Sequence, residues 1–386
     1  MTIFLNPHVD DFMAEPIGFR ILGRKPLKKY QRLLTHGVYG GDTITLLVDC
    51  SVTSLARTPF FLRFPKWVRR IWSGIEIAIW RRINRIDPKI PIYFNHKKIP
   101  NETALFLFSN KNCTDGFCLK KDLLLSYPTL YIHLSHYMIH TAEKARNIQQ
   151  LPHAAIVGDS DISENPYFKA HFSFYKKAVQ IIPFCVQHRF QSLILFRVRS
   201  GCCVATGSFH NLEQEIPNAY YQDFMRFFKT TSYHVIRQAL YDSRDENREW
   251  LTTLTSPFRE NSHAKVSPLK KLLLHFQINQ KKYFGIDIVS EYNRHRYAVV
   301  GEERSGFPAL GTFEAMACGC VVLGSDDAYY RGLDMEVGVH YWRYDGTIEG
   351  LKKEVLFLES HLDIAEKISQ NAAHYIHSNQ NKIRSA

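Results

Sequence analysis

Residues 302–325 read EERSGFPALGTFEAMACGCVVLGS, and this stretch carries the clearest indication of the fold. A charged loop and a Gly-Phe-Pro turn come first, and a helix is predicted through residues 312–318. Gly319 suits the end of a helix, and the apolar run at 320–324 is typical of a buried strand. The stretch therefore predicts the loop, helix and strand of a parallel α/β sheet.

The start of this helix is a candidate anion site. A helix that begins near residues 310–312 aims free N–H groups and the positive end of its dipole at the preceding loop, which suits a diphosphate. Gly306 and Gly311 permit a close approach to the backbone. We expect Glu314 in the first turn, where its carboxylate can accept hydrogen bonds from a ribose diol.

The pattern resembles the donor-site signature of the GT-B nucleotide-sugar glycosyltransferases, E-G-F-G-x-x-x-x-E-A-M-A-C-G. Gly306-Phe307 and the EAMACG run at 314–319 match it, whereas Ser305 occupies the place of the first glutamate and one extra residue precedes Glu314. The resemblance implies that the sugar contact of that glutamate comes from Glu303 or Glu302, and we assign Glu303 as catalytic. It also implies a set of donor-binding residues: Glu314, Gly306, Phe307, Pro308, Leu310, Gly311 and Thr312.

Short apolar runs recur in both halves of the chain, as in parallel sheets covered by helices on both faces. Strands are predicted at 43–50, 104–109, 129–137, 154–161, 179–187, 192–199, 202–208, 271–278, 297–303 and 320–325, with a helix-like stretch at 219–242. The predicted fold class is α/β of the GT-B type, with two Rossmann-like doubly wound domains facing a central cleft. The domains are an acceptor-binding one at 1–190, a nucleotide-sugar-binding one at 191–350, and closing helices at 351–386.

Further candidates lie at predicted strand ends. In many GT-B enzymes that this chain resembles, a histidine at a strand end faces the donor sugar, so His133 and His136 are candidates for sugar contact or proton transfer. A metal site at these histidines is disfavoured, because their odd spacing points them to opposite faces of a strand. Basic or polar groups expected to face the diphosphate are Arg199, Ser208, His210 and Arg304.

Asp159 and Asp161 form a D-x-D triplet after an apolar strand, where GT-A glycosyltransferases hold Mg²⁺ or Mn²⁺. A metal-dependent GT-A enzyme is therefore the main rival. We favour an interdomain loop with Asp161 capping a turn, and we expect no metal and no other cofactor. The signature resembles that of retaining enzymes; an inverting enzyme would need a general base, for which both aspartates and both histidines are candidates.

Residues 57–89 interleave tryptophans and aliphatic residues with arginines, which predicts an amphipathic basic helix. Such a helix can lie in the headgroup region of an anionic membrane, or it can pack on the core with a solvated basic face. Docking there would bring the enzyme to a lipid-linked acceptor.

The composition of the 386 residues is that of a folded protein, with 45% hydrophobic residues and a net charge of +12 that favours anionic partners. Eight scattered cysteines predict reduced thiols, and Asp10 and Asp11 interrupt any secretory signal, so we expect a cytoplasmic protein, peripheral on the inner face of the cytoplasmic membrane.

The predicted activity is sugar transfer from a nucleotide-sugar donor to a glycan or glycolipid in lipopolysaccharide, O-antigen or capsule synthesis. The alternatives are a sugar-nucleotide epimerase on the same scaffold and a basic protein that binds nucleic acid, for which no motif is present.

Overall fold

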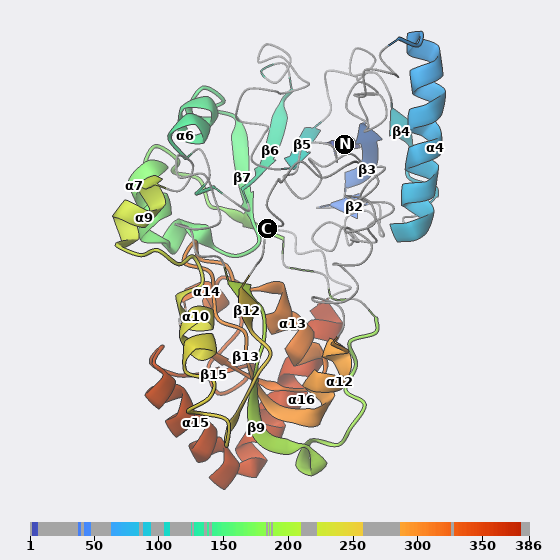
Figure 1. Cartoon of the computed structure of the whole chain (residues 1–386). Coiled ribbons are helices and arrows are strands. Elements are labelled where there is room, and N and C mark those ends of the chain that lie inside the picture. The colour runs from blue at the N-terminus through green and yellow to red at the C-terminus, as the bar shows by residue number, and fades with distance from the viewer. Residues whose placement is uncertain are drawn as a thin grey trace. The chain divides into compact units, whose positions relative to one another are not determined.

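The computed structural model of the chain (Figure 1) describes residues 2–6, 38–39, 42–47, 63–84, 88–93, 104–108, 125, 127–134, 137–138, 141–182, 184, 186, 188–209, 222–257, 286–325 and 328–379. It contains two compact units. Unit 1 includes the chain up to Asp159 and Phe168–Cys185, and unit 2 includes Ser160–Tyr167 and Val186–Lys382. Unit 2 therefore takes in residues 160–167 and most of the segment 351–386 that the sequence suggested as separate closing helices.

The sheet of unit 1 is parallel apart from one antiparallel pair at its edge. Its strands are ordered β2-β3-β1-β5-β6-β7-β8, and β4 also pairs with β3. Their bounds are β1 Thr2–Asn6, β2 Val38–Tyr39, β3 Asp42–Leu47, β4 Ile92–Tyr93, β5 Ala104–Phe108, β6 Thr129–His133, β7 Ala154–Gly158 and β8 Gln180–Ile181. The helices of this part of the chain are α4 Lys66–Asn84, α6 Thr141–Gln149 and α7 Pro166–His171.

Unit 2 has a fully parallel five-stranded sheet in the order β11-β9-β13-β14-β15. The strands are β9 Ser200–Ala205, β11 Leu251–Thr253, β13 His295–Val299, β14 Val321–Gly324 and β15 Trp342–Arg343. A separate parallel pair joins β10 (Ser208–Phe209) to β12 (Ser256–Pro257). Numbered from its first strand, this sheet has the order 2-1-3-4-5 of a doubly wound fold. The predicted α/β class with Rossmann-like units is confirmed.

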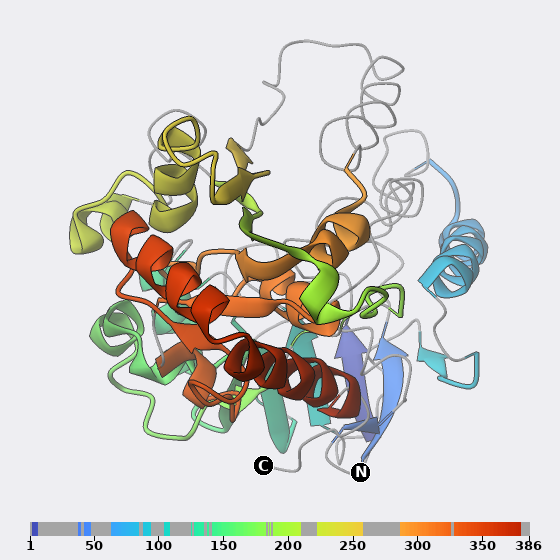
Figure 2. The ribbon, with the colours of Figure 1, turned by 90° about the horizontal axis from the view of Figure 1, so that it is seen from below.

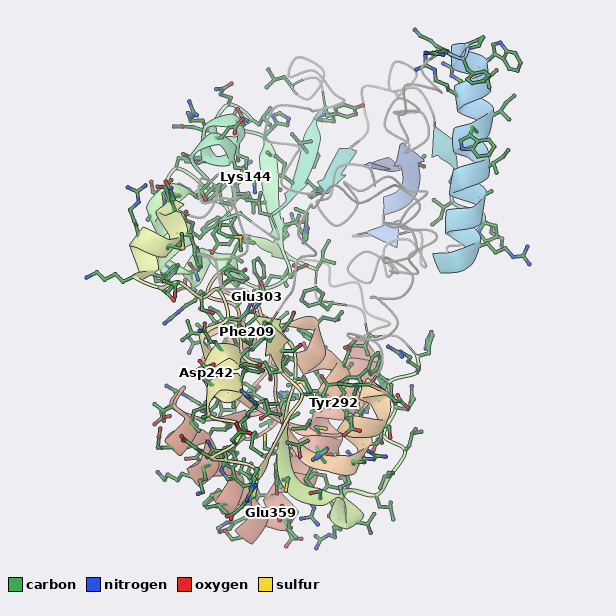
Figure 3. The ribbon with its side chains drawn as sticks, in the orientation of Figure 1. Lys144, Phe209, Asp242, Tyr292, Glu303 and Glu359 are labelled. Carbon is green, nitrogen blue, oxygen red and sulfur yellow. The ribbon has the colours of Figure 1, made fainter. Side chains whose placement is uncertain are left out.

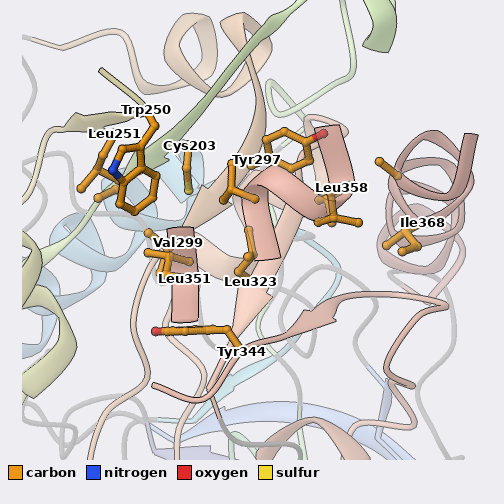
Figure 4. Close-up of a cluster of buried hydrophobic side chains, with 14 of the residues drawn as sticks. Cys203, Trp250, Leu251, Tyr297, Val299, Leu323, Tyr344, Leu351, Leu358 and Ile368 are labelled. Carbon is orange, nitrogen blue, oxygen red and sulfur yellow. The ribbon is translucent and has the colours of Figure 1, made fainter. Parts of the chain in front are cut away.

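Both faces of the unit 2 sheet are buried. Cys203, Tyr297 and Leu323 lie in one hydrophobic cluster with Leu351 and Leu358 of α15, as Figure 4 shows. The residues at alternating positions on the other face, Val204, Ala298 and Val322, are also buried. Burial on both faces explains why these strands read as continuous apolar runs in the sequence.

The helices of unit 2 lie in the segments that connect its strands and after the last strand. They are α9 Gln222–Phe228, α10 Val235–Asp242, α12 Ile288–Arg294, α13 Leu310–Ala317, α14 Ala328–Arg331, α15 Ile348–Ser360 and α16 Leu362–Asn379. α15 packs against β9, and α16, the dark red helix of Figure 2, packs against α13 and β14. The closing helices predicted for the tail are thus present as α15 and α16.

One sequence expectation for secondary structure is wrong. Residues 192–199 form no strand but a loop with a 3₁₀ turn, η5 (Phe196–Val198), in which Leu193 and Leu195 are exposed. The helix-like stretch at 219–242 contains two helices, α9 and α10. The predicted strand at 271–278 lies outside the described residues.

Candidate functional site

The candidate site lies where the strand order of unit 2 reverses. β9 and β13 are neighbours, but β11 lies beyond β9 while β14 and β15 lie beyond β13. In doubly wound sheets, ligands bind outside the carboxyl ends of the strands at such a point. These ends lead into residues 206–208 after β9 and into the loop 300–309 after β13. Figure 3 shows Glu303 of this loop at the end of unit 2 opposite Glu359 of α15.

The loop leads directly into α13, whose amino terminus has no side-chain cap. Ala309 stands at the capping position with an extended backbone, and it offers no side-chain oxygen to the first N–H groups. The first turn also carries no acidic residue. The backbone N–H groups and the positive end of the helix dipole therefore suit an anion, as the sequence predicted.

Glu314 is the fifth residue of α13, so it stands in the second turn and not in the first. Its side chain is buried, at 8% exposure. Burial, followed by the charge of Glu314, raises the pKa of Tyr292, whose hydroxyl is 2.8 Å from Thr206 Oγ1 just after β9. The charge of Glu314 therefore reaches Tyr292 beside the switch point. Its expected contact with a ribose stays a prediction.

The buried guanidinium of Arg237 ties together the two strand ends of the site. Its Nε donates to Val300 O at 2.6 Å, and its two terminal nitrogens donate to Ser208 O at 2.7 Å and Gly301 O at 2.9 Å. Arg237 comes from α10, and it fixes the backbone at both sides of the reversal point. Ser208 therefore lies beside the site with its carbonyl bound by this arginine, and its contact with the diphosphate stays a prediction.

The two neighbouring glutamates of the loop have different roles. Glu302 is buried, and its Oε1 accepts from Ser325 N at 3.0 Å and from Tyr330 Oη at 2.6 Å. Its Oε2 accepts from the Ser325 hydroxyl, so this carboxylate joins the loop to the end of β14. Glu303 keeps a partly exposed side chain, and between the two it is the carboxylate that a ligand can reach.

Backbone hydrogen bonds close the loop into a tight turn. Gly306 N donates to Glu303 O at 2.9 Å, and Glu303 N donates to Phe307 O at 3.0 Å. Gly306 has φ +91°, a value that side chains rarely allow. Asn165 Nδ2 donates to Arg304 O at 2.9 Å, and the Ser160 hydroxyl donates to Gly306 O.

The remaining signature residues lie between this turn and the first turn of α13. Phe307 and Pro308 are buried, Leu310 is half-buried, and Thr312 is buried. A Cβ at Gly311 would come within 3.0 Å of Val300 Cγ1 and 3.1 Å of Tyr292 Oη. Gly311 therefore allows α13 to pack closely against these two side chains. This packing is a second reason for glycine at this position, in addition to the predicted close approach of a ligand.

The expectation for Arg199 is wrong. Its guanidinium donates to Cys318 O and Gly319 O at the carboxyl end of α13, and also to Ile194 O and Ser192 Oγ. It precedes β9 and so lies at the opposite edge of the sheet from the loop. Arg304 fits better, because it belongs to the loop and its side chain is exposed.

The histidine and aspartate candidates lie apart from the loop. His133 ends β6 fully buried, with Nε2 3.0 Å from Oδ1 of Asp159, which follows β7. This differs from the expected position facing a sugar, and its role in sugar contact stays a prediction. Asp161 caps the 3₁₀ turn η4 (Ile162–Glu164), which confirms its predicted role as a turn cap. The described residues contain no group of three or more metal-ligating side chains, and His136 and His210 lie outside them.

Four residues at this site were not predicted from the sequence: Arg237, Tyr233, Ser160 and Asn165. Each contacts the loop from a part of the chain at least 60 residues away. Their residue types are common on surfaces, and no local spacing distinguishes them. Cys318 and Cys320, by contrast, are small buried groups as predicted, and burial raises the pKa of Cys318 to about 12.

Comparison with solved structures finds several similar chains. The chain is similar to a glycosyltransferase from Rickettsia africae ESF-5, with 13% identity and a TM-score of 0.45 over 98% of this chain and 93% of that one. It is similar to Anabaena HepE in complex with UDP-glucose, with 11% identity and a TM-score of 0.48 over 99% and 96%. A sucrose-phosphate synthase from Thermosynechococcus elongatus has 9% identity and a TM-score of 0.43 over 98% and 94%.

No protein-family model and no curated protein sequence matches the chain. Structural likeness at these identities does not carry an activity from one protein to another. The functional argument therefore rests on the loop and helix of unit 2.

Proposed function

We propose that this chain is a GT-B glycosyltransferase that transfers a sugar from a nucleoside diphosphate donor to a hydroxyl of a glycan or glycolipid. The observation that carries the proposal is the uncapped amino terminus of α13 at the switch point of a doubly wound sheet. Such a terminus binds phosphate groups through its N–H donors. The matching signature residues Gly306, Phe307 and Glu314 lie on the same loop and helix.

The proposed chemistry follows from where charge develops. When the bond between the sugar and the diphosphate breaks, negative charge grows on the leaving oxygen. The N–H groups of α13 and the exposed guanidinium of Arg304 are the groups that would stabilise it. Glu314 would accept hydrogen bonds from the ribose, and Glu303 from a sugar hydroxyl. Because these groups neutralise the charge, we propose a reaction that needs no metal or other cofactor.

A ligand screen tests this function. Melting temperatures are measured with UDP-, GDP-, ADP-, CMP- and TDP-sugars, and the sugar nucleotide that stabilises the protein is then incubated with glycan and glycolipid acceptors. We expect stabilisation by one nucleotide class and transfer only with an acceptor present. Conversion of the free sugar nucleotide without an acceptor would instead support an epimerase, and the absence of any stabilisation would contradict the proposal.

We propose further that the acceptor belongs to surface glycan assembly, of the lipopolysaccharide, O-antigen or capsule kind, and that α4 docks the enzyme on the cytoplasmic membrane. The apolar side chains of α4 are exposed in a line: Trp67 at 65%, Ile71 at 58% and Ile75 at 45%. Their spacing of four residues places them on one face of the helix. No described helix is long and apolar enough to cross a membrane.

The charges near this face favour anionic lipid as its partner. Lys66, Arg70 and Arg82 are exposed on the same helix, and its first turn carries no acidic residue. Basic residues beside exposed tryptophan are typical of helices that lie in the headgroup region. Nucleic acid would use the charges but would gain nothing from Ile71 and Ile75.

Cosedimentation with phosphatidylglycerol vesicles tests the docking. Replacing Lys66, Arg70 and Arg82 by Gln should weaken vesicle binding by about 3 kcal/mol, at about 1 kcal/mol per charge, and Ile71→Ser should weaken it as well. High salt should mimic the loss of charge, and phosphatidylcholine vesicles serve as the control. Wild-type protein that stays in the supernatant at low salt would contradict the docking. Vesicle binding that Ile71→Ser leaves unchanged would show that only the charges contribute, which is the pattern expected of a nucleic-acid site.

A further inference from the structure

Ser305 occupies the place where the signature has its first glutamate, and it is completely buried. Its hydroxyl is hydrogen-bonded to the hydroxyl of Tyr233. The same tyrosine hydroxyl donates to Oε2 of Glu303 at 2.6 Å. Three side chains, Ser305, Tyr233 and Glu303, therefore form a hydrogen-bonded row. The row ends at Glu303, which lies two residues before position 305, where the signature places its first glutamate.

The direction of the hydrogen bonds in this row follows from the donors available. A phenol carries a single proton, and an ionised carboxylate can only accept. Tyr233 therefore donates to Glu303, and the Ser305 hydroxyl donates to the phenol oxygen. Hydrogen bonds in such a chain polarise one another, so the serine strengthens the bond that holds the carboxylate.

Packing holds the tyrosine and leaves the glutamate accessible. Tyr233 is buried, and its ring centroid lies 5.5 Å from that of Phe224. The Glu303 side chain keeps 21% exposure, and its Oε1 lies 3.8 Å from His234 Nε2. The backbone of Glu303 is fixed by its two hydrogen bonds in the turn with Gly306 and Phe307. In this row, only the carboxylate end can touch a ligand.

We propose that Tyr233 is a positioning residue that aims the Glu303 carboxylate at the hydroxyls of the donor sugar. The inference rests on the proposed function. Tyr233 and Ser305 together allow Glu303 to take over the task of the glutamate that is missing at position 305. The tyrosine then affects recognition of the sugar and leaves binding of the diphosphate to α13 unchanged.

Calorimetry with two probes tests this role. The first probe is whichever of UDP-, GDP-, ADP- and TDP-glucose gives the largest thermal shift, and the second is the matching nucleoside diphosphate. We expect Tyr233→Phe and Glu303→Gln each to raise the Kd of the sugar nucleotide about tenfold and to leave that of the nucleoside diphosphate within about twofold. The double variant should be no weaker than Glu303→Gln alone, because the tyrosine acts through the carboxylate.

The control is Tyr127→Phe, since the buried Tyr127 hydroxyl has no hydrogen-bond partner in the described part of the chain. This variant should bind both probes as the wild type does. Unchanged binding by Tyr233→Phe, or an equal loss for both probes, would overturn the positioning role while leaving the proposed function in place. A wild type that binds none of the four sugar nucleotides would overturn the proposed function and this inference with it.

Discussion

Replacing Arg237 by methionine should destabilise unit 2 and loosen its candidate site. Methionine keeps an unbranched side chain, but it removes three donors from the buried carbonyls of Val300, Gly301 and Ser208. A typical intramolecular hydrogen bond contributes about 1 kcal/mol net, so the loss amounts to about 3 kcal/mol. For a unit of this size that corresponds to a melting temperature lower by about 6 to 12 °C.

Differential scanning calorimetry with and without donor measures the effect. Without donor, Arg304→Met is the matched control, because the Arg304 side chain is exposed and its loss should then leave the melting temperature within about 1 °C. Since Arg237 joins the segment after β9 to the segment after β13, its loss should also weaken donor binding. A melting temperature for Arg237→Met within about 2 °C of the wild type would refute the argument that these bonds hold the strand ends together.

Three other changes test the site and its surroundings. Glu314→Ala should weaken donor binding by about 2 to 4 kcal/mol if the carboxylate accepts two hydrogen bonds from a buried ribose; undiminished affinity in calorimetry would exclude that contact. Transfer should survive EDTA, because helix N–H groups and Arg304 replace a metal in the proposed mechanism; loss of activity that Mn²⁺ restores would favour the metal-dependent rival. Asp159→Ala should lower the free energy of unfolding in urea by about 1 to 3 kcal/mol, since it leaves the buried ring of His133 without its carboxylate; an unchanged midpoint would show that the pair contributes nothing.

Much of the fold of unit 2 could be predicted where local and tertiary signals agree. Gly319 ends α13 with φ +79°, and the apolar run after it forms β14. The apolar run at 192–199 looked similar but forms no strand, because Leu193 and Leu195 remain exposed and the chain instead bends around the Arg199 guanidinium. Hydrophobicity alone does not show which apolar run pairs with a neighbouring strand in the sheet.

The site itself was predictable only in its contiguous part. The loop and the start of α13 are adjacent in sequence, so their relation follows from helix geometry. Tyr233 reaches Glu303 across 70 residues, and Arg237 reaches Val300 across 63. Such pairs depend on how the strands are ordered in the sheet, which spacing along the chain does not encode.

The two ends of α13 are treated differently, and the difference supports the proposed location of the ligand. At the carboxyl end, the carbonyls of Cys318 and Gly319 accept from the buried guanidinium of Arg199, which places a positive charge at the negative end of the dipole. At the amino end, Ala309 has no side-chain acceptor, and its carbonyl accepts from Thr312 N at 2.9 Å. N–H groups in the first turn of a helix that the chain itself does not satisfy are met by water or a ligand. The chain therefore satisfies the carboxyl end of α13 with a side chain of its own and places no side-chain cap at the amino end, where we propose that the diphosphate binds.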